Sequence, residues 1–380
     1  MTIDPTVTSD PWEPAALRAR LDEAGQRAGD AGLDALLVTP GPDLRYLCGY
    51  DALPLERLTC LVVRVPGDPA LVVPRLEAPA AAASPAGVTG LDVVTWDETT
   101  DPYALVASLL TDARRVAVDN HMWAEKVLRL RAAMPGVEQR LAGDVLHQQR
   151  MRKSPAEIQA LRVAGAAIDR VHERMGQWLR AGRTEREVAA EIAEAIRAEG
   201  HATVDFVIVG SGPNGASPHH EVADRVIEPG DPVVVDIGGT TRAGYCSDST
   251  RMYAVGDPPA DFLAHYDVLQ RAQAAAVGHV RPGVTCASVD AAARQVIADA
   301  GHGDRFIHRT GHGIGLETHE DPYIVAGNDL ELMPGMAFSV EPGIYLPGRH
   351  GARIEDIVVC TSDGVEPLNR TTHDLVVLPA

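Results

Sequence analysis

Short apolar runs alternate with longer amphipathic stretches over the first 150 residues of the chain. Apolar runs that end at polar turn residues are typical of buried strands, and such runs lie at 33–39, 58–65, 70–73 and 114–120. Amphipathic stretches of helical period lie at 101–113 and 123–134. The Ala- and Pro-rich residues 78–87 are expected to form a surface connection. The alternation predicts an α/β domain over residues 13–150, after a loose tail over residues 1–12.

A second domain is predicted over residues 151–380. Ser154 has the character of a helix N-cap, Pro155 suits the first helical position, and Glu157 completes a capping box. A long helix is therefore expected to begin here, and the domain boundary is placed near residue 150.

The second domain contains an internal repeat with an offset of 101 residues. Each copy has a Thr cap, an amphipathic helix, a Gly-His pair and then a strand pattern; the copies begin at Gly182 and Gly283. The common register predicts two α/β halves related by a pseudo-two-fold axis, with a site at the seam.

Two acidic residues lie on what reads as a β-hairpin. Asp236 ends the apolar run of VVVDIGG (233–239), and Asp248 lies in GYCSDSTRMY (244–253). Both are equidistant from position 242, so they are expected to face each other with Cβ atoms ~4.5–5.5 Å apart. Facing carboxylates repel unless they share a proton or a cation. The alternative is that both point to water, and their apolar flanks argue against it.

A glycine-rich loop, HRTGHGIGLETHE (308–320), carries His308, His312 and His319. Its glycines let the backbone approach a bound group closely. A single histidine is more often structural than a ligand, but a cluster in such a loop favours a metal or catalytic site.

Two glutamates follow in predicted strands. Glu341 precedes Pro342 at a strand end, and ARIEDIVVC (352–360) reads as one strand with Arg353, Glu355 and Ile357 on a common face. A glutamate among apolar strand residues is costly to bury without a partner. Four carboxylates and one imidazole suit two divalent ions bridged by carboxylates and a hydroxide.

A second loop, SGPNGASPHHEVADR (211–225), carries His219 and His220 and has no evident ligand role. A histidine on a loop beside a metal site is a candidate proton donor or oxyanion stabiliser.

The overall charge disfavours some classes of binding partner. With 34 basic and 53 acidic residues the formal net charge is −19, which argues against nucleic acid and against anionic membranes. Such acidity is also compatible with a role in solubility alone.

The five cysteines are widely spaced and form no C-x-x-C pair, which argues against a disulfide framework or a thiolate zinc site. The first residues, MTIDPTVTSDPWEP, have neither the basic start nor the apolar core of a secretory signal. No apolar run approaches the ~20 residues of a membrane span. A cytoplasmic protein is expected.

The motifs together resemble the pita-bread metallopeptidase family, which includes methionine aminopeptidase, Xaa-Pro aminopeptidase and Xaa-Pro dipeptidase. The segments that carry the resemblance run in family order over roughly residues 155–375; they are SGPNGASPHH, VVVDIGG, GYCSDSTR, GHGIGLETHE, MPGMAFSVEPGIY and ARIED. The resemblance implies an α+β pita-bread catalytic domain over 151–380. It also implies, more weakly, a creatinase-type N-terminal domain over 13–150, which methionine aminopeptidases normally lack.

The resemblance implies a role for each matching residue. Two divalent ions, manganese with cobalt or zinc as alternatives, would be held by Asp236, Asp248, His312, Glu341 and Glu355. Asp248 and Glu355 would bridge both ions. His219 and His319 would contact the substrate carbonyl or the tetrahedral intermediate, Glu341 would also shuttle a proton, and Arg353 would steady the site or the substrate.

The implied activity is hydrolysis of the peptide bond before proline in a proline-containing peptide. A homodimer is also expected, because symmetric dimers are common among soluble proteins. Xaa-Pro dipeptidase is the first candidate, and Xaa-Pro aminopeptidase, acting on longer peptides, is the second. A metal-free creatinase-like hydrolase and a non-catalytic binding module are more distant alternatives, because such relatives lose metal ligands that this chain retains.

The chain departs from the family pattern at two points. Its two aspartates are 12 positions apart, where 11 is typical, which predicts a longer hairpin turn at 240–243. VAGNDLELMP (325–334) lacks the basic residue with which some prolidases hold the dipeptide carboxylate. Arg353 is then the best placed candidate for that carboxylate, with Arg349 and His350 in the loop before it.

Overall fold

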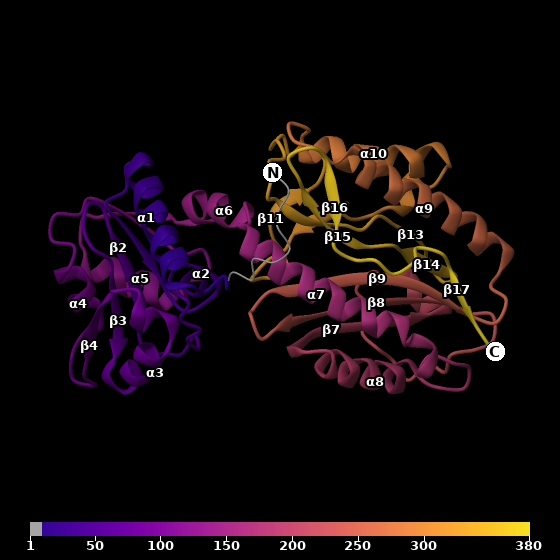
Figure 1. Ribbon diagram of the computed structural model, residues 1–380, viewed down its shortest axis with the longest axis horizontal. Helices are drawn as coiled ribbons and strands as arrows, with labels where there is room; N and C mark the ends of the chain where they lie inside the picture. Colours follow the sequence, from indigo (N-terminus) through magenta and orange to yellow (C-terminus); the bar gives the residue numbers. More distant parts are fainter. Residues whose placement is uncertain (1–9) are drawn as a thin grey trace. The chain divides into compact units, whose positions relative to one another are not determined.

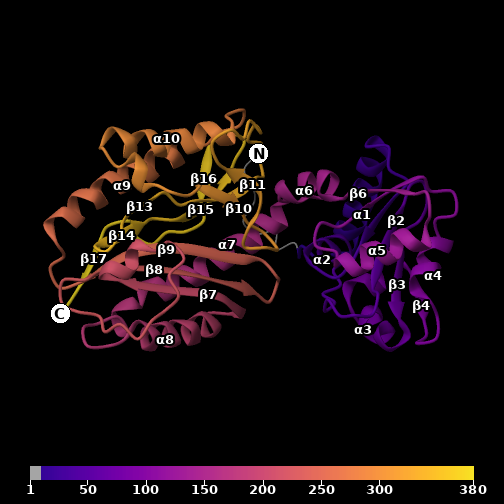
Figure 2. The same ribbon diagram turned by 180° about the vertical axis from the view of Figure 1, so that it is seen from behind.

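The structure, a computed structural model, describes residues 10–380. Most of the tail predicted over residues 1–12 therefore lies outside the described residues. Contacts divide the described chain into two compact units, residues 10–150 and residues 151–380. Figures 1 and 2 show their elements from opposite sides.

The first unit is built on one mixed six-stranded sheet of order β4-β3-β2-β1-β5-β6. Its strands are β1 Ala35–Val38, β2 Cys60–Arg64, β3 Ala70–Pro74, β4 Asp92–Trp96, β5 Arg115–Val118 and β6 Glu138–Leu141. Its helices are α1 Pro14–Asp30, α2 Pro42–Cys48, α3 Ala78–Ala83, α4 Pro102–Ser108, α5 Ala124–Ala133 and α6 Gly143–Met151. The predicted α/β class is confirmed, and β2 and β3 form an antiparallel hairpin.

The surface connection predicted at residues 78–87 is largely exposed, but it contains a helix. Residues Ala78–Ala83 form α3, and Ala81 is fully buried. Alanine has the highest helix propensity, and a proline is tolerated in the first turn, so composition alone misleads here.

The second unit contains two larger sheets and a separate hairpin, of orders β17-β9-β8-β7, β11-β10-β12-β15-β16 and β13-β14. Its long strands are β7 His201–Ser211, β8 Pro232–Thr241 and β9 Cys246–Val255. Its shorter strands are β10 Gly311–Gly313, β11 Glu320–Ile324, β12 Ala337–Val340, β13 Gly343–Leu346, β14 His350–Arg353, β15 Asp356–Cys360, β16 Val365–Pro367 and β17 Val376–Leu378. Its helices are α7 Pro155–Glu173, α8 Glu185–Ala198, α9 Ala260–His279 and α10 Cys286–Asp299.

Each large sheet has its own pair of helices. Apolar side chains of α7 and α8 pack with β8 and β9 in one core, and those of α9 and α10 pack with β12, β14 and β15 in another (Figure 1). The predicted start of α7 is confirmed, because Ser154 and Glu157 form both hydrogen bonds of a capping box.

The internal repeat is visible in the hydrogen bonds. Thr184 caps α8 and Thr285 caps α10 through their side chains. The same backbone bonds then tie each helix start to a later segment; they run from Gly182 to Ile227 and from Glu185 to Arg225 in the first half, and from Gly283 to Leu332 and from Cys286 to Leu330 in the second. These paired contacts support the predicted pseudo-two-fold relation of the halves.

The halves differ after the helix. Strand β7 has 11 residues, whereas the strand expected after the second Gly-His pair is reduced to Gly311–Gly313, with an irregular register at His312. Glycines favour bulges and close backbone approaches over long regular strands.

Candidate metal centre

The second unit encloses a cavity of about 670 Å³ between its strands. All eight side chains predicted from the sequence to form the site line this cavity: His219, Asp236, Asp248, His312, His319, Glu341, Arg353 and Glu355. They come from β8, β9, β10, the ends of β12 and β14, and two loops.

The predicted register of the hairpin is wrong by two residues, because the centre of the turn lies one position later than expected. Asp236 faces Thr250, and Asp248 faces Gly238, because the turn occupies residues 242–245 and not 240–243. The two aspartates are diagonal neighbours on one face of the hairpin, where Cα atoms are ~7–8 Å apart. That separation leaves room for an ion between their carboxylates.

The strand predicted over residues 352–360 is interrupted. Strand β14 ends at Arg353 and pairs with β13, whereas β15 begins at Asp356 and pairs with β12. Glu355 lies in the break, where its backbone N–H donates to the carbonyl oxygen of Thr250. The Thr250 hydroxyl donates to Glu355 Oε2 at 2.7 Å. Glu355 is thus fastened to β9 beside Asp248.

The potential ligand atoms form two neighbouring triads that share Glu355. Those of Asp236, Asp248 and Glu355 lie within 4.8 Å of one another, and so do those of His312, Glu341 and Glu355. His312 Nε2 lies 3.2 Å from Glu341 Oε1 and 3.7 Å from Asp248 Oδ2. One bridging carboxylate between two triads is the arrangement expected of a two-ion site.

Burial makes these carboxylates costly without cations. Burial, and then the charges of the other acidic groups, raise the pKa of Asp248 and the pKa of Glu355 well above their ordinary values. Oδ1 of Asp236 and Oε1 of Glu355 are buried without a hydrogen-bond partner within the described structure. Divalent cations that prefer oxygen ligands would give these unpartnered oxygens a partner and would remove the repulsion between the carboxylates.

Glu341 differs from its neighbours. Burial acts to raise its pKa, but the hydrogen bond and charge of His312, with the charges of His308 and Arg353, lower the pKa of Glu341 to about 2. Glu341 is therefore ionised at neutral pH.

Arg353 is occupied by the site itself. Its guanidinium pairs with Asp236, donates from Nη1 to the Tyr345 hydroxyl at 2.8 Å, and donates from Nε to Thr250 Oγ1 at 3.2 Å. Each of its nitrogens has an acceptor, so Arg353 orients Asp236 and has little capacity left for a substrate.

His319 lies at the open side of the cavity. Desolvation by its surroundings, and then the charge of His312, lower the pKa of His319 to about 4, so its ring is neutral at pH 7. Arg309 Nη2 donates to His319 Nδ1 at 3.4 Å, which leaves the proton on Nε2. His319 is thereby held as a hydrogen-bond donor. Its nitrogen also lies within 4.8 Å of ligand atoms of Asp248 and His312, so distance alone does not separate it from the ligands.

His219 lines the same open side and is exposed. Its neighbour His220 points elsewhere, because its Nε2 contacts Glu185 at 2.7 Å. The structure thus separates the two histidines of the 211–225 loop, and only His219 borders the cavity.

Sequence reasoning missed several residues of the site. Tyr345 accepts from Arg353 and contacts His308 Nε2 at 2.9 Å. Phe206 and Ile208 form part of the cavity wall, and their alternation on one strand was the available signal. Arg309 also lines the cavity and was read only as part of the histidine loop.

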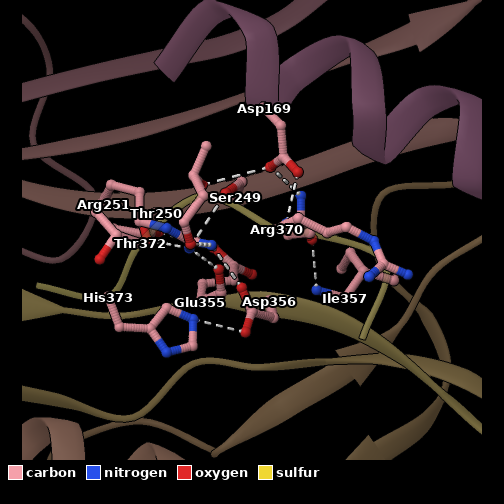
Figure 3. Close-up of polar contacts among 12 residues, drawn as sticks. Asp169, Ser249, Thr250, Arg251, Glu355, Asp356, Ile357, Arg370, Thr372 and His373 are labelled. Atoms are coloured by element: carbon pink, nitrogen blue, oxygen red, sulfur yellow. Dashed lines mark hydrogen bonds and ion pairs between the residues drawn. The ribbon is translucent and has the colours of Figure 1, made fainter. Parts of the chain in front are cut away.

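A second buried network lies behind the centre (Figure 3). Arg251 donates from Nη1 to the carbonyl oxygen of Glu355 at 2.6 Å and from Nη2 to Asp356 Oδ1 at 2.7 Å. Gln273 and His373 approach the other oxygen of Asp356 at 3.1 and 2.8 Å. This network fixes the backbone on which Glu355 is carried.

Both units are similar to known proteins. Residues 159–362 match the family model of metallopeptidase family M24, and residues 20–152 match that of the Creatinase/Prolidase N-terminal domain. A probable dipeptidase PepE of Mycobacterium tuberculosis is 57% identical over 95% of this chain and 96% of its own length. An Xaa-Pro dipeptidase of Lactobacillus delbrueckii is 36% identical over 94% of this chain and 99% of its own. The crystal structure of dipeptidase PepE from Mycobacterium ulcerans matches with a TM-score of 0.93 at 56% identity, covering 97% of this chain and 99% of that one.

Proposed function

The chain belongs to metallopeptidase family M24, and from this membership and the geometry of its site we propose that it is a metal-dependent Xaa-Pro dipeptidase. The observation that carries the proposal is the pair of ligand triads sharing Glu355. Asp236, Asp248 and Glu355 would hold one divalent ion, and His312, Glu341 and Glu355 the other, with Asp248 also within reach of His312.

The ligand set favours manganese. Four carboxylates and one imidazole form an oxygen-rich set without thiolate, which suits manganese, with cobalt or zinc as alternatives. The bound ions would supply Lewis acidity and lower the pKa of water to near neutral.

The protein side chains account for the remaining needs of peptide hydrolysis. Neutral His319, with its proton on Nε2, and His219 would donate to the carbonyl oxygen as negative charge develops there. Glu341, which lines the cavity beside His312, would pass a proton to the departing proline nitrogen.

The preference for dipeptides over longer peptides depends on a positively charged side chain that can bind the free carboxylate of the substrate. A dipeptide ending in proline carries this charge next to the scissile bond, and burying it unpaired is costly. The contacts of Arg353 are saturated, which speaks against the expectation that it binds substrate. Arg309 is half-buried at the cavity and stacks over Tyr323 at 4.4 Å. We assign the substrate carboxylate to Arg309.

The test is a panel of Xaa-Pro dipeptides and Xaa-Pro-Yaa tripeptides, assayed with added Mn²⁺. Dipeptides should show the higher kcat/KM. Higher kcat/KM on tripeptides and longer peptides would identify an Xaa-Pro aminopeptidase instead. Activity that is independent of metal would favour the creatinase-like alternative, and metal binding without hydrolysis would favour a binding module.

Arg309→Ala should lower kcat/KM for dipeptides about 10- to 100-fold more than for tripeptides, the worth of one charge-assisted hydrogen bond. The ratio between the two substrates removes any effect transmitted through His319. Arg305→Ala is the matched control, because Arg305 is exposed and pairs only weakly with Asp304. An unchanged ratio in Arg309→Ala would refute the assignment.

The setting of the enzyme is part of the proposal. All five cysteines are free and buried, which fits a reducing cytoplasm. Within residues 10–380, no helix has the length and apolar character needed to cross a bilayer. We further propose a homodimer, the commonest symmetric assembly of soluble proteins.

A further inference from the structure

A second cluster of potential metal ligands lies outside the cavity, where α9 meets β14 (Figure 1). Ligand atoms of Asp261, His265 and His350 lie within 4.8 Å of one another. The ring of His302 approaches that of His265 to 4.5 Å between centroids. The four residues come from the first two turns of α9, the residue before a short 3-10 turn, and the start of β14.

The hydrogen bonds within the cluster are incomplete. His350 is buried, and its Nε2 contacts Asp261 Oδ2 at 3.2 Å. Nδ1 of His265 is buried and has no partner among the described residues. An unpartnered buried nitrogen is costly unless something ligates it.

The alternative is a purely structural cluster. Asp261 pairs with Arg349 as well as with His350, and the rings contact each other edge to face or at a tilt. An ion pair and ring contacts explain Asp261 and His350. They leave the orphaned Nδ1 of His265 unexplained.

We propose that Asp261, His265 and His350 form a separate site for one Zn²⁺ ion, with His302 or water as the fourth ligand. Three or four ligands with imidazole in the majority match tetrahedral zinc. This set differs in kind from the carboxylate-rich cavity, which contains a single imidazole among its five ligands, so the two sites should prefer different metals. Arg349 is exposed and would swing away from Asp261 when the ion binds.

The bound ion would join the start of α9 to β14, the strand that ends at Arg353. Because zinc would bind only the folded chain there, it should stabilise the protein by linkage. The site is thus structural in effect and does not depend on the catalytic proposal.

The experiment counts zinc in full-length protein dialysed against buffered Zn²⁺, by elemental analysis, in wild type and His265→Ala. The variant should hold one zinc ion fewer per chain, and its affinity for zinc at this position should be at least ~100-fold lower. This loss is larger than the one usually caused by removing a residue that only supports a metal ligand. The difference between the two proteins is informative whatever the catalytic cavity holds. Equal zinc content would overturn the proposal.

Three further variants sharpen the result. His279→Ala, on the same helix but bonded to Ser288, should retain all zinc. Asp261→Asn should lose the same ion as His265→Ala and serves if the latter fails to fold. Arg349→Gln removes the competing cation, so it should tighten zinc binding about fivefold, on the order of a surface ion pair. Zinc binding that weakens or stays unchanged in Arg349→Gln would contradict the assignment of Asp261.

Discussion

Glu355 and Asp356 are neighbours in the chain and almost equally buried, with 1% and 2% of their surfaces exposed. Asp356 has partners at both oxygens, and the hydrogen bond from His373 and the charge of Arg251 lower its pKa although burial raises it. Glu355 has one unpartnered oxygen, and burial with its acidic neighbours raises its pKa. Within a few ångströms the protein therefore keeps one carboxylate compensated and another uncompensated.

The presence or absence of protein partners distinguishes a buried carboxylate that stabilises the fold from one that is available to bind metal. A buried charge with a complete set of protein partners holds elements together, and here it joins β9 to the C-terminal segment around Arg251 (Figure 3). Gln273 adds a contact from α9. A buried carboxylate that lacks such partners is costly unless a cation supplies them. Glu355 and Asp248, whose pKa values are both raised by burial and by acidic neighbours, are of the second kind.

Glu355→Gln should have the largest effect. It removes the charge shared by both triads, so kcat/KM should fall on the order of 10⁴-fold, which corresponds to a rise of several kcal/mol in the activation free energy. The fold should be retained. Steady-state kinetics and circular dichroism measure the two effects. Activity within tenfold of wild type would show that Glu355 does not bridge the ions.

Asp356→Asn should instead act on stability. It leaves the buried guanidinium of Arg251 without its carboxylate, which should cost ~3–5 kcal/mol of unfolding free energy. Urea unfolding of the two variants in the metal-free protein gives the comparison directly. If Glu355→Gln were the more destabilising of the two, the distinction drawn between the neighbours would be wrong.

His319→Ala should reduce kcat by ~10²–10³-fold, the usual cost of one lost oxyanion donor. Metal content should remain at the wild-type value, and His219→Ala should behave in the same way. Elemental analysis decides the point, because loss of metal in either variant would make that histidine a ligand.

In the metal-free protein, the two kinds of carboxylate should make folding stability depend on pH in opposite directions. This effect should be smaller than those of the substitutions above. Asp248 and Glu355 have raised pKa values in the fold, so their contribution to stability is complete below their ordinary values of 3.8 and 4.5 and is lost as pH rises. Asp356, whose pKa is lowered, loses its contribution only as pH falls below its ordinary value of 3.8. The Tm of chelator-treated protein should therefore fall between about pH 5 and pH 8.

Glu355→Gln should make this fall shallower, and saturating Mn²⁺ should abolish it, because metal binding requires ionised ligands. A Tm of the metal-free protein that rises steadily over the same interval would contradict the assigned shifts.

The sequence predicted the family, the fold class and the residues that line the cavity. Apolar flanks and motif order marked Asp236, Asp248 and Glu355 as candidates before their contacts were known. The family and fold class are confirmed by the two family models. The ligand roles remain predictions.

The remainder depended on tertiary contacts. The local pattern of ARIEDIVVC places Glu355 and Asp356 on opposite faces, but it does not show which of them lacks partners, because the partners come from segments up to about 100 residues away. The hairpin register depended on where the extra residue entered the turn, and Arg309 became a candidate only once Arg353 was seen to be saturated. Such facts are set by packing, which periodicity does not report.

The most direct measurement of the central claim is a crystal structure of the Mn²⁺-loaded protein with anomalous diffraction at the manganese edge. The account predicts two anomalous peaks in the cavity of each chain, both in contact with Glu355, one beside Asp236 and the other beside His312. A single peak, or peaks that leave Glu355 without a metal contact, would contradict it.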